Sequence, residues 1–224
     1  MQTVSRASFG GSLLLAGAAG FVDAIGFILS GGLFVSFMSG NSTQAGVEVS
    51  RGEVQTAAVA LSLVAGFVLG VLAGRVLGLL TERVRIGGRI LGLGAALFAA
   101  TGIVALWPHP GYSLAALAAV MGAMNTLFIV AGRAQVAITY ATGTLVSLGI
   151  GLADRIVGGH RGGWVRPLLL WASITLGALL GSLAWRAMGA LALLVAAGAL
   201  CVLGLAQIIR AVARVDSRSR PVRR

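Results

Sequence analysis

Charged residues are scarce in this chain, and their scarcity decides its broad class. Only 10% of the 224 residues are charged, whereas 58% are hydrophobic and the mean hydropathy is +0.97. A soluble domain carries about 25% charged residues. The chain has no lysine, so its formal net charge of +11 comes from arginines that stand between apolar runs and at the C-terminus. That distribution favours cytoplasmic flanks of membrane segments over a nucleic-acid-binding face.

Residues that build disulfides, metal sites and hydrolase active sites are also few. Cys201 is the one cysteine, so no disulfide within the chain and no Cys-based metal site is available. The two histidines, His109 and His160, lie far apart in expected loops. The sequence has neither H-E-x-x-H nor G-x-S-x-G, and its glycine-rich stretches follow no expected strand. We therefore expect no enzyme activity, no cofactor and no metal.

Long apolar runs recur along the whole sequence. They fall at about residues 9–29, 32–50, 54–80, 90–107, 112–132, 134–153, 165–186 and 188–210. Runs of this length are typical of membrane helices, and the 34 glycines suit close helix packing in lipid. The first run has features of a signal peptide, but its apolar character continues to Leu29, which favours an uncleaved span. The sequence predicts an all-α, polytopic membrane helical bundle.

The arginines indicate how many segments cross the membrane. Segments 32–50 and 134–153 carry the most polar residues and are the weakest spans. If both enter the membrane and return on their own side, only Arg51 and Arg186 lie outside, as the positive-inside rule favours. The prediction is about six crossings plus two broken or re-entrant segments, in the bacterial inner membrane with both termini cytoplasmic.

The two halves of the chain share a pattern at an offset near 103 residues. The matches are Ser39-Gly40-Asn41 with Thr142-Gly143-Thr144, Gly70, Gly74 and Gly78 with Ser173, Gly177 and Gly181, and Gly20-x-x-Asp23 with Gly122-x-x-Asn125. Three crossings in each half would invert the second half relative to the first, as in many secondary transporters and some channels. We expect a first membrane repeat at 1–107, a second at 108–210 and a basic cytosolic tail at 211–224, which can touch anionic lipid.

At these residues the chain resembles a known family of bacterial membrane proteins. The stretches GFVDAIGF and GGLFVSFMSGN, followed by GAMN and ITYATGTL, are similar to the YoaK / DUF1275 (UPF0700) family over nearly the full length. The resemblance implies a polytopic inner-membrane protein of about six spans and supplies no substrate. The sequence departs from the family pattern after Asn125, where Phe128-Ile129 stands in place of an arginine-rich pair and Arg133 is the nearest arginine.

Asp23 is the strongest candidate for chemistry, because an acid inside a span costs at least about 2.5–3.5 kcal/mol. It can take a proton or coordinate a cation, or it can simply bond to the broken segment that follows at Gly31-Gly32. Asn125 holds the matching place in the second half, where it lines a shared central site or makes an interhelical hydrogen bond. Both alternatives stay open from sequence.

Two small polar clusters and two small-residue stripes complete the candidate residues. The clusters are Ser39, Gly40, Asn41, Ser42 and Thr43, and Thr142, Gly143 and Thr144. They permit a helix break and can cap the half-helix that follows, so they either line a solute pathway or form plain capped turns. The stripes are Gly66, Gly70, Gly74 and Gly78, and Ser173, Gly177 and Gly181, which we expect to pack helices within the chain or in a homo-oligomer.

Three functions fit these features. The main expectation is a small-solute or ion transporter in the lipid bilayer, with Asp23 carrying the proton or cation and the polar clusters contacting the solute. The alternatives are a passive channel of the same architecture and a non-transporting membrane scaffold or regulator. Glu48, Glu53 and Asp154 are expected to be solvated helix ends.

Overall fold

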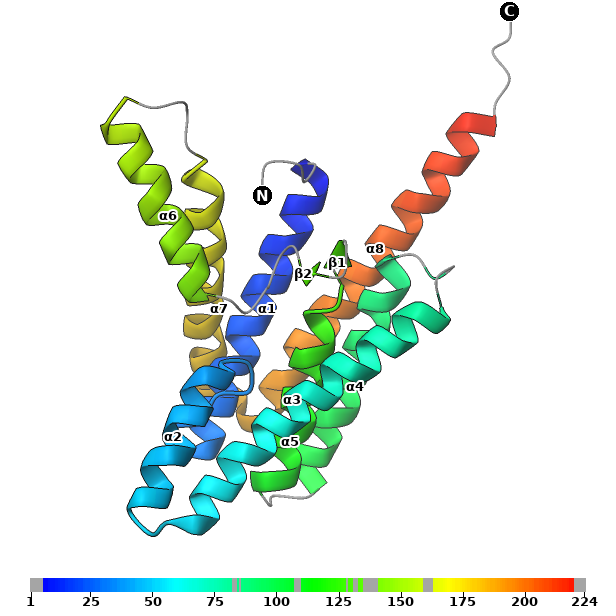
Figure 1. The fold of residues 1–224 in the computed structure, drawn as a ribbon. Coiled ribbons are helices and arrows are strands. Elements are labelled where there is room, and N and C mark those ends of the chain that lie inside the picture. The colour runs from blue at the N-terminus through cyan, green and yellow to red at the C-terminus, as the bar shows by residue number, and fades with distance from the viewer. Residues whose placement is uncertain are drawn as a thin grey trace, which may run out of the picture.

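A computed structural model shows the chain as a bundle of helices with two very short strands (Figure 1). It describes residues 6–81, 84, 86–106, 110–127, 129–130, 133–134, 141–158 and 163–219. The expectations for His109, His160, Phe128 and the tail beyond 219 fall outside these ranges.

The described chain forms eight α-helices, one 3-10 helix and a two-stranded antiparallel ladder. In chain order these are α1 (Arg6–Ser30), α2 (Met38–Ser50), α3 (Val54–Leu80), α4 (Ile86–Leu106), α5 (Pro110–Met124), β1 (Ile129–Val130), β2 (Arg133–Ala134), α6 (Ala141–Ile156), α7 (Val165–Met188), η1 (Gly189–Leu191) and α8 (Ala192–Ser219). Each expected apolar segment overlaps one α-helix, and the last, 188–210, also contains η1. The strands, in which Val130 pairs with Arg133, are a feature that the apolar pattern did not predict.

The length and composition of these helices make the chain a helical membrane protein. Helical stretches long and apolar enough to cross a bilayer are Phe9–Ser30, Val54–Leu80, Ile86–Leu106 and Val165–Ala213, and Ser113–Met124 is a shorter apolar helix. The stretch Val165–Ala213 contains both α7 and α8. Large apolar side chains cover the outside of the bundle, for example Leu106, which is 85% exposed. Such a surface suits contact with lipid acyl chains.

Two pairs of helices pack with their backbones almost in contact. Helix α3 runs parallel to α5, and a methyl group added at Gly66 or Gly70 would overlap the carbonyl oxygen of Ala115 or Ala119. Helix α1 runs parallel to α7, and a methyl group at Gly177 would overlap the carbonyl oxygen of Gly17. Only glycine permits this approach, because any other residue carries a Cβ.

The two small-residue stripes therefore pack on different partners. In the first stripe Gly66, Gly70 and Gly74 face α5, whereas Gly78 lies beside Arg89 of α4, whose Nη2 donates to the Gly78 carbonyl at 3.0 Å. In the second stripe, Ser173, Gly177 and Gly181 face α1, and the Ser173 hydroxyl donates to the Leu13 carbonyl at 2.6 Å. Neither stripe packs on the other.

A third pair, α4 and α8, packs in the antiparallel sense. Gly87 of α4 meets Gly204 of α8, and Gly94 meets Cys201, so the residue numbers run in opposite directions. Helices α1 and α5 meet at the centre, where Leu15, Ile25 and Met124 are fully buried. Apolar side chains fill this core.

Helices α2 and α6 lie at opposite ends of the bundle (Figure 1). Helix α1 begins, α8 ends and α6 lies at one end of the bundle, while α2 lies at the other end. With 13 and 16 residues, α2 and α6 are about 20 and 24 Å long, which is less than the ~30 Å hydrocarbon core. The 15-residue helix α5, about 22 Å long, is equally short, so length alone does not take α2, α5 or α6 across the bilayer.

Candidate functional site

The candidate site is the break in the chain between α1 and α2. Gly31 and Gly32 have φ angles of +72° and +135°, values that L side chains rarely adopt, and residues 31–37 form no regular helix. The Ser30 hydroxyl accepts the N–H groups of Leu33 at 2.7 Å and Gly32 at 3.3 Å. The glycine pair expected to break the first apolar segment is therefore the point at which the chain turns back.

Asp23 holds the returning chain against α1. Its Oδ1 accepts the backbone N–H groups of Val35 at 2.8 Å and Ser36 at 2.9 Å. Gly26, one turn further along α1, leaves room for Val35, because a Cβ there would lie 2.6 Å from Val35 Cγ1. The carboxylate therefore accepts backbone N–H groups that have no partner within a helix. This is the second alternative for Asp23, a hydrogen bond to the broken segment.

Asn41 closes the break from the other side. Its side chain is fully buried, its Oδ1 accepts the Phe34 N–H at 2.9 Å, and its Nδ2 donates to the Phe34 carbonyl at 2.5 Å. Together Ser30, Asn41 and Asp23 give acceptors to the consecutive N–H groups of residues 32–36. Side chains thus satisfy backbone N–H groups that no helix or strand satisfies.

The rest of the first polar cluster faces away from this site. Ser39, Ser42 and Thr43 are exposed, and the hydroxyls of Ser42 and Thr43 donate to carbonyls of their own helix, at Met38 and Ser39. The expectation that this cluster caps α2 is wrong. The N-cap residue is Phe37, with no side-chain cap, because the cluster lies inside the first turns of α2 and Asn41 turns back to Phe34.

The Gly40 position is closely packed for a different reason. A Cβ on Gly40 would lie 2.5 Å from Cδ1 of Phe37. Phe34 stacks edge-on against Phe37, with ring centroids 5.4 Å apart, and lies 4.9 Å from Phe27. Gly40 therefore makes room for the aromatic cluster that covers the break.

In the second half, the matching residues lie at two places, Asn125 at the end of α5 and Thr142, Gly143 and Thr144 in the first turn of α6. Asn125 follows α5 directly and donates from Nδ2 to the Met121 carbonyl at 2.9 Å. Thr142 is exposed, Gly143 is half-buried and Thr144 is buried. The Gly143 carbonyl accepts a hydrogen bond from the Ser147 hydroxyl at 2.9 Å. The segment 135–140, which precedes α6 as 31–37 precedes α2, lies outside the described residues.

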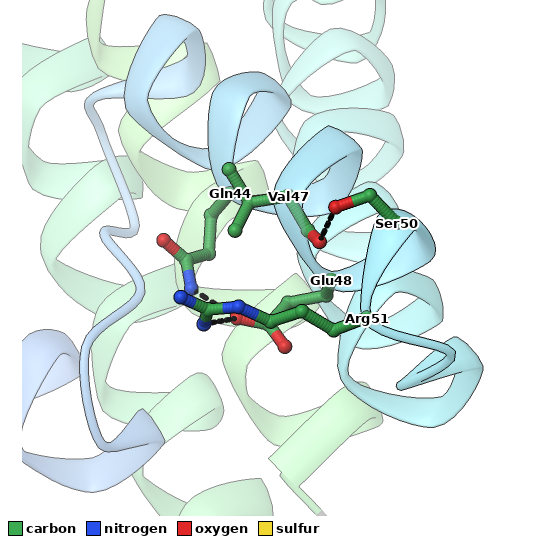
Figure 2. A network of polar contacts seen from close by, with 5 residues as sticks. All are labelled: Gln44, Val47, Glu48, Ser50 and Arg51. Atoms are coloured by element: carbon green, nitrogen blue, oxygen red, sulfur yellow. Dashed lines mark hydrogen bonds and ion pairs between the residues drawn. The ribbon is translucent and has the colours of Figure 1, made fainter.

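Glu48 is a buried acid that the sequence analysis placed at a solvated end. It is 7% exposed, and its Oε1 accepts from Gln44 Nε2 at 2.6 Å and from Arg51 Nη1 at 3.3 Å (Figure 2). The expectation was right for Glu53 and Asp154, which are exposed. The signal was the spacing, since Glu48 lies seven residues after Asn41 and hence on the same helix face.

A cavity of about 330 Å³ lies elsewhere, between α1, α7 and α8. Apolar side chains line it, among them Phe21, Leu176 and Leu203. Neither Asp23, Asn41 nor Asn125 reaches it. Its chemistry therefore does not match the polar pathway expected from sequence. In the part of the chain that the structure describes, no three His, Cys, Asp or Glu side chains form a group that could hold a metal ion.

Comparison with known proteins gives a family and one named relative. A family model described as "Protein of unknown function (DUF1275)" matches residues 11–206. The chain is similar to the UPF0700 transmembrane protein RA0705 of Rhizobium meliloti (strain 1021), with 35% identity over 176 residues, which cover 78% of this chain and 75% of the relative. No solved structure matches the chain.

Proposed function

This chain belongs to the DUF1275 family of transmembrane proteins, whose description assigns no activity, and we propose from its own residues that it transports a small polar or ionic solute. We place it in the bacterial inner membrane with both termini cytoplasmic. In this proposal α1, α3, α4, α5, α7 and α8 cross the bilayer, and α2 and α6 enter it from opposite faces.

Helix lengths support six crossings. As one straight helix, the stretch Val165–Ala213 would be about 73 Å long, more than twice the ~30 Å hydrocarbon core, so in this proposal α7 and α8 cross separately. Gly189, with a φ of +58°, makes the turn between these two helices. Helix α5 is only 15 residues long, but it runs alongside the 27-residue helix α3.

The packing pairs support two inverted halves. In this arrangement helices α1 to α4 of the first half correspond, in order, to α5 to α8 of the second. Under that correspondence the packed pair α1–α7 matches the packed pair α5–α3. The pair α2–α3 likewise matches the pair α6–α7. The correspondence leaves the α4–α8 pair unchanged, and these two helices are antiparallel, as inversion requires. Buried polar positions agree as well, since Asn41 of α2 corresponds to Thr144 of α6 at an offset of 103.

The observation that carries the proposal is the side-chain-capped break at residues 31–37. An uninterrupted helix would satisfy its own backbone, whereas this break requires three polar side chains to do so. Broken helices near the middle of the bilayer are where secondary transporters bind their substrate and coupling ion. When Asp23 takes a proton or a cation, its bonds to Val35 and Ser36 weaken, and the break can rearrange. This gives Asp23 a role in coupling as well as in structure.

The test begins with the purified protein, screened for ions and metabolites that raise its melting temperature. A compound that does so is then loaded into proteoliposomes, and its exchange against external radiolabelled compound is measured. A transporter gives saturable exchange, which Asp23→Asn reduces at least tenfold while Ser42→Ala leaves it intact. Flux that never saturates identifies the channel alternative. No flux of any stabilising compound favours the scaffold alternative.

A further inference from the structure

The buried face of α2 carries a second acid beyond the break. Its buried residues are Asn41, Ala45 and Glu48, which follow one another at helical spacing. Asn41 belongs to the break, and Glu48 lies about 10 Å further along the helix axis, near the C-terminal end of α2. Helix α2 lies at the end of the bundle opposite the start of α1 (Figure 1). Gln44 stands between Asn41 and Glu48 and donates to Glu48 at 2.6 Å. Polar side chains thus recur along α2 from the break to its C-terminal end.

A structural role alone does not account for Glu48. Replacing a buried ion pair by apolar residues of similar volume is often neutral or stabilising. At the corresponding position of α6, 103 residues later, stands Gly151, against which Trp164 packs, since a Cβ there would lie 3.0 Å from Trp164 Cα and Cβ. The same half-helix packing is therefore made in the second half without an acid.

The pairing of Glu48 is of a kind that a cation can replace. The Arg51 side chain is 65% exposed, whereas that of Glu48 is 9% exposed, and their single contact is 3.3 Å long. An exposed partner is screened by solvent and contributes little. Two other charged residues lie on or beside α3, which packs on α2. Glu53 directly precedes α3 and is exposed, and Arg75 lies near the far end of α3, away from Glu48.

We propose that Glu48 and Gln44 form a cation site at the outer end of the polar face of α2. A proton or a monovalent cation from the adjacent membrane face replaces Arg51 at the Glu48 carboxylate, and from there it moves along α2 toward Asn41 and Asp23. The Glu48 carboxylate supplies oxygen ligands suited to a hard cation, and the Gln44 amide, whose Nε2 now donates to Glu48, adds its oxygen when it turns over. The proposal rests on the proposed transport function, for which it supplies the entry site of the coupling ion.

Binding to the full-length protein in detergent tests the site without requiring transport. The melting temperature is measured against sodium chloride, with N-methylglucamine chloride keeping the ionic strength constant, and separately against pH at fixed sodium. A sodium-dependent rise identifies a metal cation, and a rise on acidification alone identifies a proton. Equal curves for sodium and N-methylglucamine, together with no dependence on pH, would overturn the proposal.

Three variants locate the effect. Glu48→Gln keeps the size and polarity of the side chain and should weaken the cation response at least tenfold, which corresponds to about 1.4 kcal/mol. Glu53→Gln removes an exposed acid five residues away and should respond as the wild type does. Arg51→Gln removes the competing charge and should lower the half-saturating concentration several-fold. A Glu48→Gln protein that elutes as a single folded species and responds like the wild type would refute the site.

The outcome for the site is separate from the outcome for transport. If Glu48→Gln loses the cation response while no proteoliposome flux is found for the wild type, the site stands and the transport function fails. If solute exchange is present and unchanged in Glu48→Gln, transport stands and the site fails.

Discussion

Replacing Asn41 by leucine tests the physical argument on which the candidate site depends. Leucine has the same number and branching of side-chain heavy atoms, so the change removes the amide group without opening a cavity in a position that is fully buried. The two hydrogen bonds to the backbone N–H and carbonyl of Phe34, at 2.9 and 2.5 Å, disappear, and so does the weak bond from Nδ2 to Met38 Sδ at 3.9 Å. The backbone N–H and carbonyl of Phe34 then lose their described partners in an apolar surrounding.

The magnitude lies between two limits. If each of the two lost bonds to Phe34 costs only the ~0.6 kcal/mol typical of side-chain hydrogen bonds in membrane proteins, the variant loses about 1.2 kcal/mol. If both Phe34 groups stay unsatisfied, each costs about 1–3 kcal/mol, which gives about 2–6 kcal/mol. We expect the upper range, because the neighbouring acceptors Ser30 and Asp23 already bind residues 32, 33, 35 and 36.

The measurement is reversible unfolding in mixed micelles with increasing SDS, followed by circular dichroism. Ser42→Ala is the matched control, because Ser42 is one residue away, exposed, and bonded only to the Met38 carbonyl in its own helix. It should change the unfolding free energy by less than about 0.5 kcal/mol. If Asn41→Leu is as stable as Ser42→Ala, the break is not held by side chains and the argument for the site is wrong.

Two further predictions concern packing and topology. Gly70→Ala should destabilise the bundle by about 1–3 kcal/mol, because the added Cβ overlaps the Ala119 carbonyl. Gly102→Ala in α4 is the control, because the added Cβ meets open space, and it should be neutral or stabilising by up to about 1 kcal/mol. Unfolding in SDS measures the free energy of both variants. For the topology, single cysteines are placed at the exposed ends of α2 and α6 by Ser50→Cys and Val157→Cys, in a Cys201→Ala background. An impermeant maleimide should label the two cysteines from opposite membrane faces. Labelling of both from the same face would exclude the inverted arrangement.

The sequence predicted the elements whose causes are local. The apolar stretch 54–80 is the helix α3 to the residue, because the run is long and its polar boundaries are sharp. Gly31-Gly32 was identified as a break because no other residue pair tolerates such φ angles so readily. Asp23 was singled out because an acid inside an apolar segment needs a reason.

The partners of these residues could not be predicted, because they depend on how the chain folds back. Nothing in the spacing shows that Asp23 bonds to residues 12 and 13 positions later, or that Asn41 turns away from its own helix end to Phe34. The expected capping by the polar cluster failed for this reason, since the free donors of the break compete with the helix N-terminus for the same side chain. Tertiary geometry decides that competition.

The burial of Glu48 was not predicted, because the expectation rested on its place near the end of segment 32–50 rather than on its helix face. An acid near the end of a half-helix is solvated on one face and buried on the other, and Asn41 already marks the buried face. Applied to α6, the same rule places Thr144 and Gly151 on the buried face, as observed.

The differences between the halves bear on the proposed mechanism more than their likeness does. Close backbone packing is common to both, since α1–α7 and α3–α5 use glycine in the same way. The acids are not shared: Asp23 corresponds to Asn125, and Glu48 corresponds to Gly151. If the two halves exchange conformations during transport, the protein alternates between two arrangements of the same helices. A cation bound at Asp23 or Glu48 has no equivalent site in the other half, so it stabilises one of these two arrangements more than the other. Only such a difference in binding shifts the equilibrium between them. The direction of coupling would then be set in the first half, and moving the acid by the pair Asp23→Asn and Asn125→Asp should alter coupling while leaving the packing intact.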